Sequence, residues 1–416
     1  MAPSSAPLSS VLPPLVCGTA TFNSLYNRDP YALPTTGIVH KALSLGIRAF
    51  DTSPYYGPAE ELLGKALDTP IVRDNFQREN YFLITKVGRI AESEFDYSPP
   101  WIRQSVQRSL ERLRTDYLDV VYCHDVEFVS AEEVLNAVKE LRRIRTESEI
   151  IKYVGISGYP IDVLCELAEL VLRETGEPLD AVMSYANHTL QNTTLGSEGV
   201  ARLKSAGVDV VPNASPLGMG LLRRDGVPVG GQGDFHPANN DLRAAVRNAS
   251  QYCDAHGEKL EVIAIRFALE TWIRAGASVG SLGDPASGVP LRREKIEDVG
   301  GQKLGISVIG VSTLEELTQT MRVWRSILDG LEVGRERDIE AAKWASDHEW
   351  SLNRQKEVQN LAEGVQKAIG TWVDFAWPSP APGFVNVRKL PPIVPAPLPT
   401  PAASPTEKIL SLADEV

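Results

Sequence analysis

The sequence has no apolar run that reaches the roughly 18 residues a membrane-spanning helix requires. Its first residues, MAPSSAPLSSVLPPL, lack the basic start and the long apolar stretch of a secretory signal peptide. Positive charge is in the minority, since 42 lysines and arginines face 54 aspartates and glutamates and give a net charge of −12. Nucleic acids and anionic membranes bind basic surfaces, so this charge argues against both as partners. We expect a cytoplasmic protein whose partner is a small molecule.

Cysteine and histidine are also scarce. The four cysteines are far apart in the chain and form no CxxC pair, so we expect them to be reduced and mostly buried. The six histidines never occur at HxxxH or HxH spacing, which argues against a metal site. The cysteines are Cys17, Cys123, Cys165 and Cys253.

Short β-rich runs alternate with segments of helical periodicity, such as residues 101–113 and 131–144, along most of the chain. Eight such runs predict an α/β fold of the (β/α)8 TIM-barrel type more than an open doubly wound sheet, which usually has fewer strands. No GxGxxG follows the first run, so any nicotinamide site must be built differently from the usual dinucleotide fold. The runs are residues 15–19, 48–52, 81–87, 118–124, 153–157, 180–185, 208–213 and 306–311.

Loops and chain ends surround the predicted barrel. Two insertions rich in glycine and proline, near 225–240 and 278–305, are of a kind that often covers the mouth of a barrel. In the aromatic-rich segment 370–384, Trp372 and Trp377 either pin the tail across the barrel or close over a substrate. The predicted segments are a flexible N-terminus (1–12), the barrel (13–332), a helical extension that packs on the barrel (333–385) and a disordered or extended proline-rich tail (386–416).

Four side chains that can carry chemistry lie at or just beyond the ends of three successive predicted strands. Asp51 ends the second run and Tyr56 follows it in FDTSPYYG, while Lys86 and His124 end the third and fourth. Catalytic groups of barrels lie at this end of the strands. Taken singly, these residues are also consistent with a salt bridge, a structural histidine and a packed tyrosine. Their conjunction at one rim favours a catalytic site.

This set of residues suits hydride transfer between a carbinol carbon and a nicotinamide. That reaction requires a proton to leave or join the oxygen, and tyrosine ordinarily has too high a pKa for easy exchange near neutral pH. A nearby Lys86 ammonium, held by Asp51, is expected to lower the pKa of Tyr56. His124 is expected to orient the substrate oxygen through a hydrogen bond.

The motif DTSPYYG, with Lys86 and His124 at the following strand ends, resembles the aldo-keto reductase superfamily and its Asp, Tyr, Lys and His tetrad. The similarity covers roughly residues 12–330. The segments LPPLVCGTATFN, AVMSYANHTL and NASPLGMGLL are similar to the sugar-dehydrogenase branch, which includes fungal D-arabinose 1-dehydrogenases and plant L-galactose dehydrogenases. The resemblance implies a soluble oxidoreductase that acts on CH–OH groups.

The resemblance also implies a nicotinamide cofactor site at the strand ends, to which Asp51 contributes. Many members carry a glutamine on the sixth strand and an aromatic residue at the end of the seventh, where this chain has Tyr185 and Ala214. The implied contacts are Gly18 and Thr19 beside the nicotinamide, Ser157 at its carboxamide, Tyr185 near its ring, Ser215, Leu217 and Gly218 along the pyrophosphate, and Gly310, Ser312 and Glu316 around the adenosine.

Glu316 bears on the choice between NAD and NADP, because it aligns with an arginine that grips the 2'-phosphate in members selective for NADP. A carboxylate repels that phosphate and can accept hydrogen bonds from ribose hydroxyls, so NAD is the expected cofactor, with NADP as the alternative. Ser312 and Glu315 can instead be explained as a capping box that starts a helix.

The leading hypothesis is therefore an NAD-dependent aldose 1-dehydrogenase that forms a sugar lactone. D-arabinose is the first candidate substrate, followed by L-fucose and L-galactose. In the loop at residues 89–100, Phe95 and Tyr97 are candidate substrate contacts beside Tyr56 and His124, although an ordinary surface loop is equally consistent with the sequence. The alternatives are an NADPH-dependent reductase of aldehydes or ketones, including pyridoxal, and a non-catalytic barrel that binds nucleotide and regulates a partner.

Overall fold

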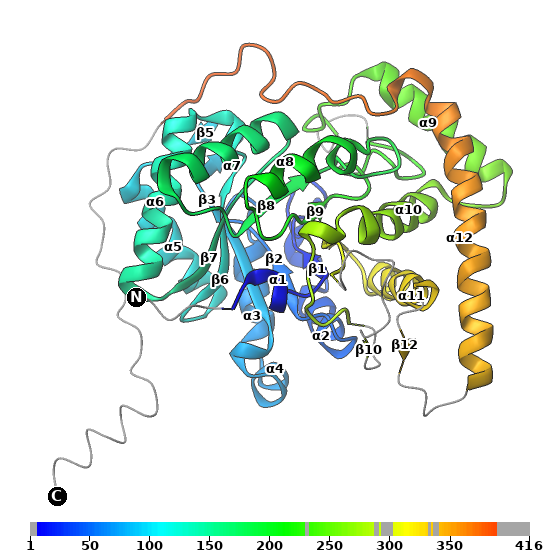
Figure 1. Cartoon of the computed structure of the whole chain (residues 1–416), viewed down its shortest axis with the longest axis horizontal. Helices are drawn as coiled ribbons and strands as arrows, with labels where there is room; N and C mark the ends of the chain where they lie inside the picture. The colour runs from blue at the N-terminus through cyan, green and yellow to red at the C-terminus, as the bar shows by residue number, and fades with distance from the viewer. Residues whose placement is uncertain are drawn as a thin grey trace, which may run out of the picture.

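Eight parallel strands close into a barrel, as the sequence predicts (Figure 1). The computed structural model describes residues 6–228, 233–286, 303–331 and 341–388, with the strand pairs 291–292 and 334–335. Around the barrel the strands follow one another in the order β1-β11-β9-β8-β7-β6-β3-β2. Their bounds are β1 (Leu15–Gly18), β2 (Ala49–Asp51), β3 (Phe82–Val87), β6 (Leu118–His124), β7 (Ile151–Gly158), β8 (Ala181–Tyr185), β9 (Asn213–Ala214) and β11 (Ser307–Gly310).

The seventh predicted run, 208–213, is the one that differs most from its strand. Only Asn213 and Ala214 pair as β9, and Val210 makes a single bridge to Ala181. Pro212 has no amide hydrogen and cannot donate to a ladder, which interrupts the pairing of this run.

Helices follow the strands in alternation and cover the outside of the barrel (Figure 1). The helix after β6 shows why such segments fold: Ser130 caps it by accepting from Glu133 N, and the Glu133 carboxylate accepts from Ser130 N in return. The barrel helices are α2 (Thr35–Ser44), α3 (Ala59–Leu67), α5 (Pro99–Leu113), α6 (Ala131–Ser148), α7 (Ile161–Thr175), α8 (Val200–Ser205), α10 (Leu260–Ala275) and α11 (Leu314–Gly330). Additional elements are α4 (Pro70–Asn75), α9 (Asn240–Ala255) and two short sheets, β4 (Arg89–Ala91) with β5 (Glu94–Phe95) and β10 (Leu291–Arg292) with β12 (Gly334–Arg335).

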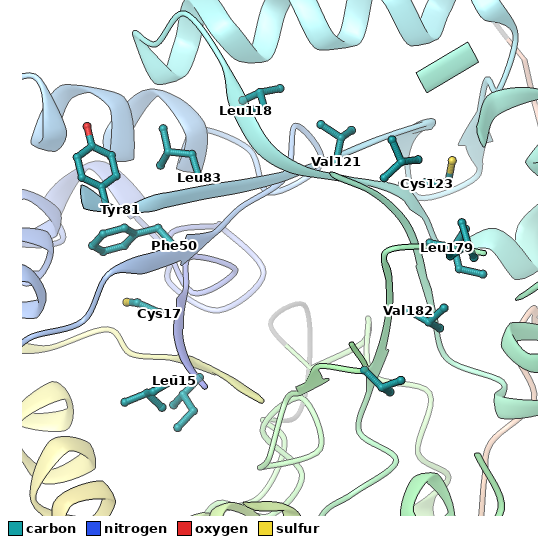
Figure 2. Close-up of a cluster of buried hydrophobic side chains, with 14 of the residues drawn as sticks. Leu15, Cys17, Phe50, Tyr81, Leu83, Leu118, Val121, Cys123, Leu179 and Val182 are labelled. Atoms are coloured by element: carbon teal, nitrogen blue, oxygen red, sulfur yellow. The ribbon is translucent and has the colours of Figure 1, made fainter. Parts of the chain in front are cut away.

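The barrel strands separate two apolar layers because successive strand residues point to opposite faces. On β6, Val121 and Cys123 belong to the layer between strands and helices, whereas Val120 and Tyr122 belong to the cluster inside the barrel. Figure 2 shows side chains of the outer layer on the strands. All four cysteines are buried and free, as expected. None of the described helices combines the length and apolar composition that a membrane crossing needs.

The N-terminal residues close the bottom of the barrel, which corrects the expectation of a flexible start at residues 1–12. Residues 8–11 form α1 (Leu8–Val11), and Leu8 and Leu12 are buried in the cluster inside the barrel. Leu8 and Leu12 lie four residues apart and therefore share one helical face, a signal present in the sequence. Residues 1–5 lie outside the described part of the chain.

The two insertions lie at opposite ends of the barrel. The described part of 278–305 precedes β11 and packs at the bottom, where Ser281 donates to Ser9 O, so it does not cover the mouth as expected. It connects a helix to a strand, and only loops that leave strands lie at the other end. The described part of 225–240 follows β9, and the ring of Phe235 contacts Tyr26 from the loop after β1.

The chain after the barrel forms a long helix, α12 (Ala341–Ile369), packed on α9, α10 and α11 (Figure 1). Residues 370–388, here called the C-terminal strap, then cross to the β4–β5 hairpin on the far side (Figure 1). Residues 386–388, which were predicted to belong to the tail, are bound there: Asn386 exchanges two hydrogen bonds with the Phe95 backbone, and Val387 N donates to Ser93 O. The rest of the tail, 389–416, lies outside the described residues.

Candidate active site

Three neighbouring strands bring the four predicted catalytic side chains together at the carboxyl end of the barrel. Lys86 Nζ on β3 donates to Asp51 Oδ1 at the end of β2 (2.7 Å) and to Thr52 O (2.8 Å). The centre of the Tyr56 ring lies 4.8 Å from Lys86 Nζ and 5.6 Å from the ring of His124, which ends β6. The structure therefore brings these four side chains into one cluster.

Lys86 and Asp51 form a buried ion pair, with side chains 1% and 6% exposed. Burial raises the pKa of Asp51, and the charge and hydrogen bond of Lys86 oppose that rise. The second carboxylate oxygen, Oδ2, is buried and has no hydrogen-bond partner. A buried acceptor without a donor is costly, and a hydroxyl group from a bound molecule would satisfy it.

The pKa of Tyr56 corrects the expected effect of Lys86. Burial of the phenol raises its pKa well above the ordinary value of 10.0, and the charges of Asp51 and Asp125 raise it further. The ammonium of Lys86 lies over the face of the ring and is paired with a carboxylate, so its positive charge does not outweigh burial and the two carboxylates at the phenol oxygen. In this structure Tyr56 is a phenol at neutral pH.

His124 is buried, uncharged and fixed in orientation. Burial lowers its pKa to about 3, and its backbone carbonyl accepts from the Tyr97 hydroxyl (2.6 Å). Its Nδ1 lies 3.0 Å from Ser53 Oγ, which also accepts from Tyr55 N. Because the Ser53 hydroxyl can donate to Nδ1, the arrangement favours the imidazole proton on Nε2. Ser53 was not predicted as a site residue, although it lies within FDTSPYYG.

A second ion pair, also missed from the sequence, lies beside the histidine. Asp125 follows His124 in a left-handed conformation (φ 57°), and its Oδ2 lies 3.6 Å from His124 Nε2. Arg89, which follows β3 by two residues, donates to the same oxygen of Asp125 and also to the Tyr55 hydroxyl (3.0 Å). The adjacency of Asp125 to His124 and of Arg89 to β3 was the available signal.

The two predicted loop contacts, Phe95 and Tyr97, are each only 1% exposed. Phe95 stacks on Phe128 (4.9 Å between ring centres) and contacts Phe384 of the C-terminal strap. Tyr97 lies behind His124 and holds its backbone. Both side chains support neighbouring groups of the site and present no open surface to a substrate.

The residues assigned to the cofactor all lie at the carboxyl ends of the strands or just beyond them. Thr19 N and Oγ1 donate to Asp51 O, Ser157 Oγ donates to Cys123 O, and Tyr185 ends β8. The unpartnered Asp51 Oδ2 at this rim fits a ribose hydroxyl of a nicotinamide dinucleotide. The remaining assigned residues are Gly18 on β1, Ser215, Leu217 and Gly218 in the loop after β9, and Gly310, Ser312 and Glu316 from β11 to α11.

Glu316 is engaged at the start of its own helix. Thr313 Oγ1 accepts from Glu316 N (3.1 Å), and the Glu316 carboxylate accepts from Ser312 N (2.7 Å). The capping pair is therefore Thr313 with Glu316 and not Ser312 with Glu315, because Thr313 is the last residue with extended backbone before the helix. The Glu316 side chain stays exposed, so its charge faces solvent at this rim.

The C-terminal strap crosses the same end of the barrel. The Trp377 ring stacks on Tyr159, the residue that follows β7 (4.6 Å between centres, 5° between planes), and is 4% exposed. Ser379 Oγ donates to the Glu127 carboxylate, and burial together with Asp125 raises the pKa of Glu127 to about 8. Gln191 anchors the start of the strap by donating to two of its carbonyls. No group of three or more histidine, cysteine or acidic residues within the described ranges is placed to hold a metal ion.

Comparison with known proteins gives the same family by sequence, and a solved structure shares the fold. A model of the Aldo/keto reductase family matches residues 14–340. The chain is 45% identical to D-arabinose 1-dehydrogenase of Saccharomyces cerevisiae over 268 residues, which cover 64% of this chain and 78% of the yeast protein. It is 37% identical to L-galactose dehydrogenase of Arabidopsis thaliana, over 56% of this chain and 68% of the plant protein. Among solved structures, an aldo-keto reductase from Bacillus halodurans in its holo form shares the fold, with a TM-score of 0.50 and 19% identity over 79% of this chain and 94% of that one.

Proposed function

Because this chain belongs to the aldo/keto reductase family, we propose that it is an oxidoreductase that oxidises an aldose at C1 to the sugar lactone. The observation that carries the proposal is the cluster of Tyr56, His124 and the Lys86–Asp51 pair at the strand ends. The names of the yeast and plant relatives, both sugar dehydrogenases, support an aldose as the substrate.

The side chains divide the reaction between orientation and proton transfer. When bound, an oxidised nicotinamide supplies the acceptor for the hydride that leaves C1, together with a positive charge. His124 donates from Nε2 to the anomeric oxygen and fixes its position. Tyr56 takes the proton of the anomeric hydroxyl in its phenolate form, which is a small fraction of the enzyme near neutral pH, and becomes the neutral phenol. Lys86, held by Asp51, supports that phenolate through its charge.

D-arabinose is the proposed first substrate, followed by L-fucose and L-galactose, which share the ring configuration of D-arabinose at C2. The test follows NADH or NADPH formation with these three sugars and D-glucose, with NAD and NADP offered separately. Turnover of at least one of the three sugars with a nicotinamide cofactor supports the proposal. Silence on all sugars, with NADPH consumed when aldehydes are supplied, would show a carbonyl reductase instead. Tight cofactor binding without any turnover would favour a regulatory barrel.

NAD is the proposed cofactor because the exposed Glu316 carboxylate would repel a 2'-phosphate at the adenosine end. The test compares kcat/KM for NAD and NADP in the wild type and in Glu316→Gln. We expect the wild type to prefer NAD and the variant to narrow that preference by about threefold to tenfold, as expected for one exposed charge near an anion. An unchanged ratio would remove Glu316 from the account of cofactor choice and leave the sugar reaction untouched.

A further inference from the structure

The ion pair beside His124 contains a carboxylate, that of Asp125, which is placed to bind the substrate although it is not one of the four tetrad residues. We propose that Asp125, fixed by Arg89, accepts a hydrogen bond from the hydroxyl on C2 of the aldose and so determines which sugars are oxidised. This inference rests on the proposed function, because it takes the anomeric oxygen to lie between Tyr56 and His124.

The Asp125 carboxylate lies beside the ring of His124. Asp125 Oδ2 lies 3.6 Å from His124 Nε2, the nitrogen that faces the anomeric oxygen. Oδ2 accepts from Arg89, whereas Oδ1 accepts no hydrogen bond from any residue in the described part of the chain. The side chain is only 4% exposed. A nearly buried carboxylate with an unused oxygen therefore lies next to the place of reaction.

The Asp125–Arg89 pair is charged and fixed in position. Burial alone would raise the pKa of Asp125, but the charge and the hydrogen bond of Arg89 oppose that effect and the pKa is lowered, so the carboxylate is ionised near neutral pH. Arg89 is held by the Tyr55 hydroxyl and by three aromatic rings, with its guanidinium 3.8 Å from the Tyr55 ring centre. Burying such a pair costs desolvation energy that its own attraction does not always offset. A pair fixed in this way is preorganised to bind a polar group of the substrate.

The structure of an aldose determines which of its groups can donate a hydrogen bond to Asp125. An ionised carboxylate only accepts hydrogen bonds, so its partner must carry a proton. In the pyranose, C1 is flanked by the ring oxygen, which has no proton, and by C2 with its hydroxyl. Of these two neighbours, only the C2 hydroxyl can donate to Asp125. The configuration at C2 would then decide whether that hydroxyl points toward the carboxylate.

A matched pair of sugars tests this directly. 2-Deoxy-D-ribose is D-arabinose without the C2 hydroxyl. D-ribose is the epimer of D-arabinose at C2. In Asp125→Asn, the ratio of kcat/KM for D-arabinose to kcat/KM for 2-deoxy-D-ribose is expected to fall by about 10- to 100-fold, the usual effect of weakening a hydrogen bond to a charged group. This ratio isolates the contact at C2, because 2-deoxy-D-ribose never makes the bond, whereas the effect of the lost charge on Tyr56 and His124 acts on both sugars. The ratio of the two values in one preparation is independent of the amount of folded enzyme.

Asp119→Asn is the matched control. Asp119 is a buried carboxylate on β6, the strand that Asp125 follows, and it is paired with Arg78 (2.8 Å) at the opposite end of the barrel. Its loss is expected to lower stability and leave the ratio between the two sugars unchanged. Arg89→Lys is a second variant that keeps the ion pair but holds the carboxylate less firmly, and its ratio is expected to fall between the wild type and Asp125→Asn.

The outcomes separate the inference from the proposed function. A wild type that oxidises none of D-arabinose, L-fucose and L-galactose with either cofactor overturns the proposed function and the inference together. The inference alone is overturned if the wild type oxidises D-arabinose and Asp125→Asn lowers kcat/KM equally for both sugars, or lowers it for neither. If Asp125→Asn does not fold, an unchanged ratio in Arg89→Lys overturns it. A ratio that falls by about 10- to 100-fold supports Asp125 as the residue that binds the C2 hydroxyl.

Discussion

Replacing Lys86 by methionine tests the buried ion pair that supports the site. The change removes the ammonium that donates to Asp51 Oδ1 at 2.7 Å and to Thr52 O at 2.8 Å, in a pair whose side chains are 1% and 6% exposed. Breaking one partner of such a pair typically costs about 3–5 kcal/mol, because the other charge remains buried and unpaired. We expect the free energy of unfolding of Lys86→Met to fall by about that amount at neutral pH.

A double variant gives the magnitude a control. In Asp51→Asn with Lys86→Met neither charge remains, so we expect it to be at least about 2 kcal/mol more stable than Lys86→Met alone. Burial raises the pKa of Asp51, and without Lys86 nothing opposes that rise. The single variant should therefore regain stability as the pH falls, when Asp51 binds a proton in the folded state, while the double variant should not.

Urea unfolding followed by tryptophan fluorescence, at neutral and mildly acidic pH, measures these free energies, and aldose oxidation is assayed on the same preparations. We expect the double variant to recover stability but not activity, since it lacks the ammonium beside Tyr56. A cost below about 1 kcal/mol for Lys86→Met, or a double variant no more stable than the single one, would refute a strongly coupled buried pair.

Three further predictions concern proton transfer and the C-terminal strap. Because the pKa of Tyr56 is raised well above 10.0, kcat/KM for aldose oxidation should rise by about tenfold per pH unit from neutral to mildly alkaline pH, and a flat profile would contradict a phenolate acceptor. Glu127, with its pKa raised to about 8, keeps in the folded state a proton that the unfolded chain releases near pH 4.5, so its contribution to stability declines as the pH rises between these values. The stability of Glu127→Gln relative to the wild type, from thermal melts, should improve over that range, and a constant difference would show that Glu127 does not titrate as stated. Trp377→Ala removes the ring stacked on Tyr159, and we expect hydrogen exchange in residues 370–388 to speed up by at least about tenfold and KM for the aldose to rise with kcat nearly unchanged. An unchanged KM with a lower melting temperature would mean that the strap only pins the tail.

The sequence was sufficient for the barrel and for the tetrad because both depend on local pattern. Strand β6 was predicted at its bounds, 118–124, since its apolar segment Val120–Cys123 ends at a polar His–Asp pair. The carboxyl ends of parallel strands meet at one rim, so placing Asp51, Lys86 and His124 at strand ends was enough to predict that they meet. The family model and the relatives confirm the predicted family.

What the sequence did not reveal depends on tertiary contacts. The raised pKa of Tyr56 follows from the packing around its partly buried ring and from the proximity of Asp51 and Asp125, which no spacing rule reports. The Arg89–Asp125 pair joins residues 36 positions apart through a hairpin and a left-handed turn. The packing of α1 under the barrel was missed because a proline- and serine-rich start suggested flexibility, although Leu8 and Leu12 are buried.

The most direct test of the account is the rate of D-arabinose oxidation by Tyr56→Phe beside the matched control Tyr153→Phe. Tyr153 loses the same hydroxyl at the opposite end of the barrel, where it donates to Ala6 O. With saturating NAD or NADP, the account predicts that Tyr56→Phe lowers kcat by at least about 100-fold while cofactor binding persists, and that Tyr153→Phe keeps the wild-type kcat. A Tyr56→Phe enzyme that oxidises D-arabinose within about tenfold of the wild-type rate would contradict Tyr56 as the proton acceptor.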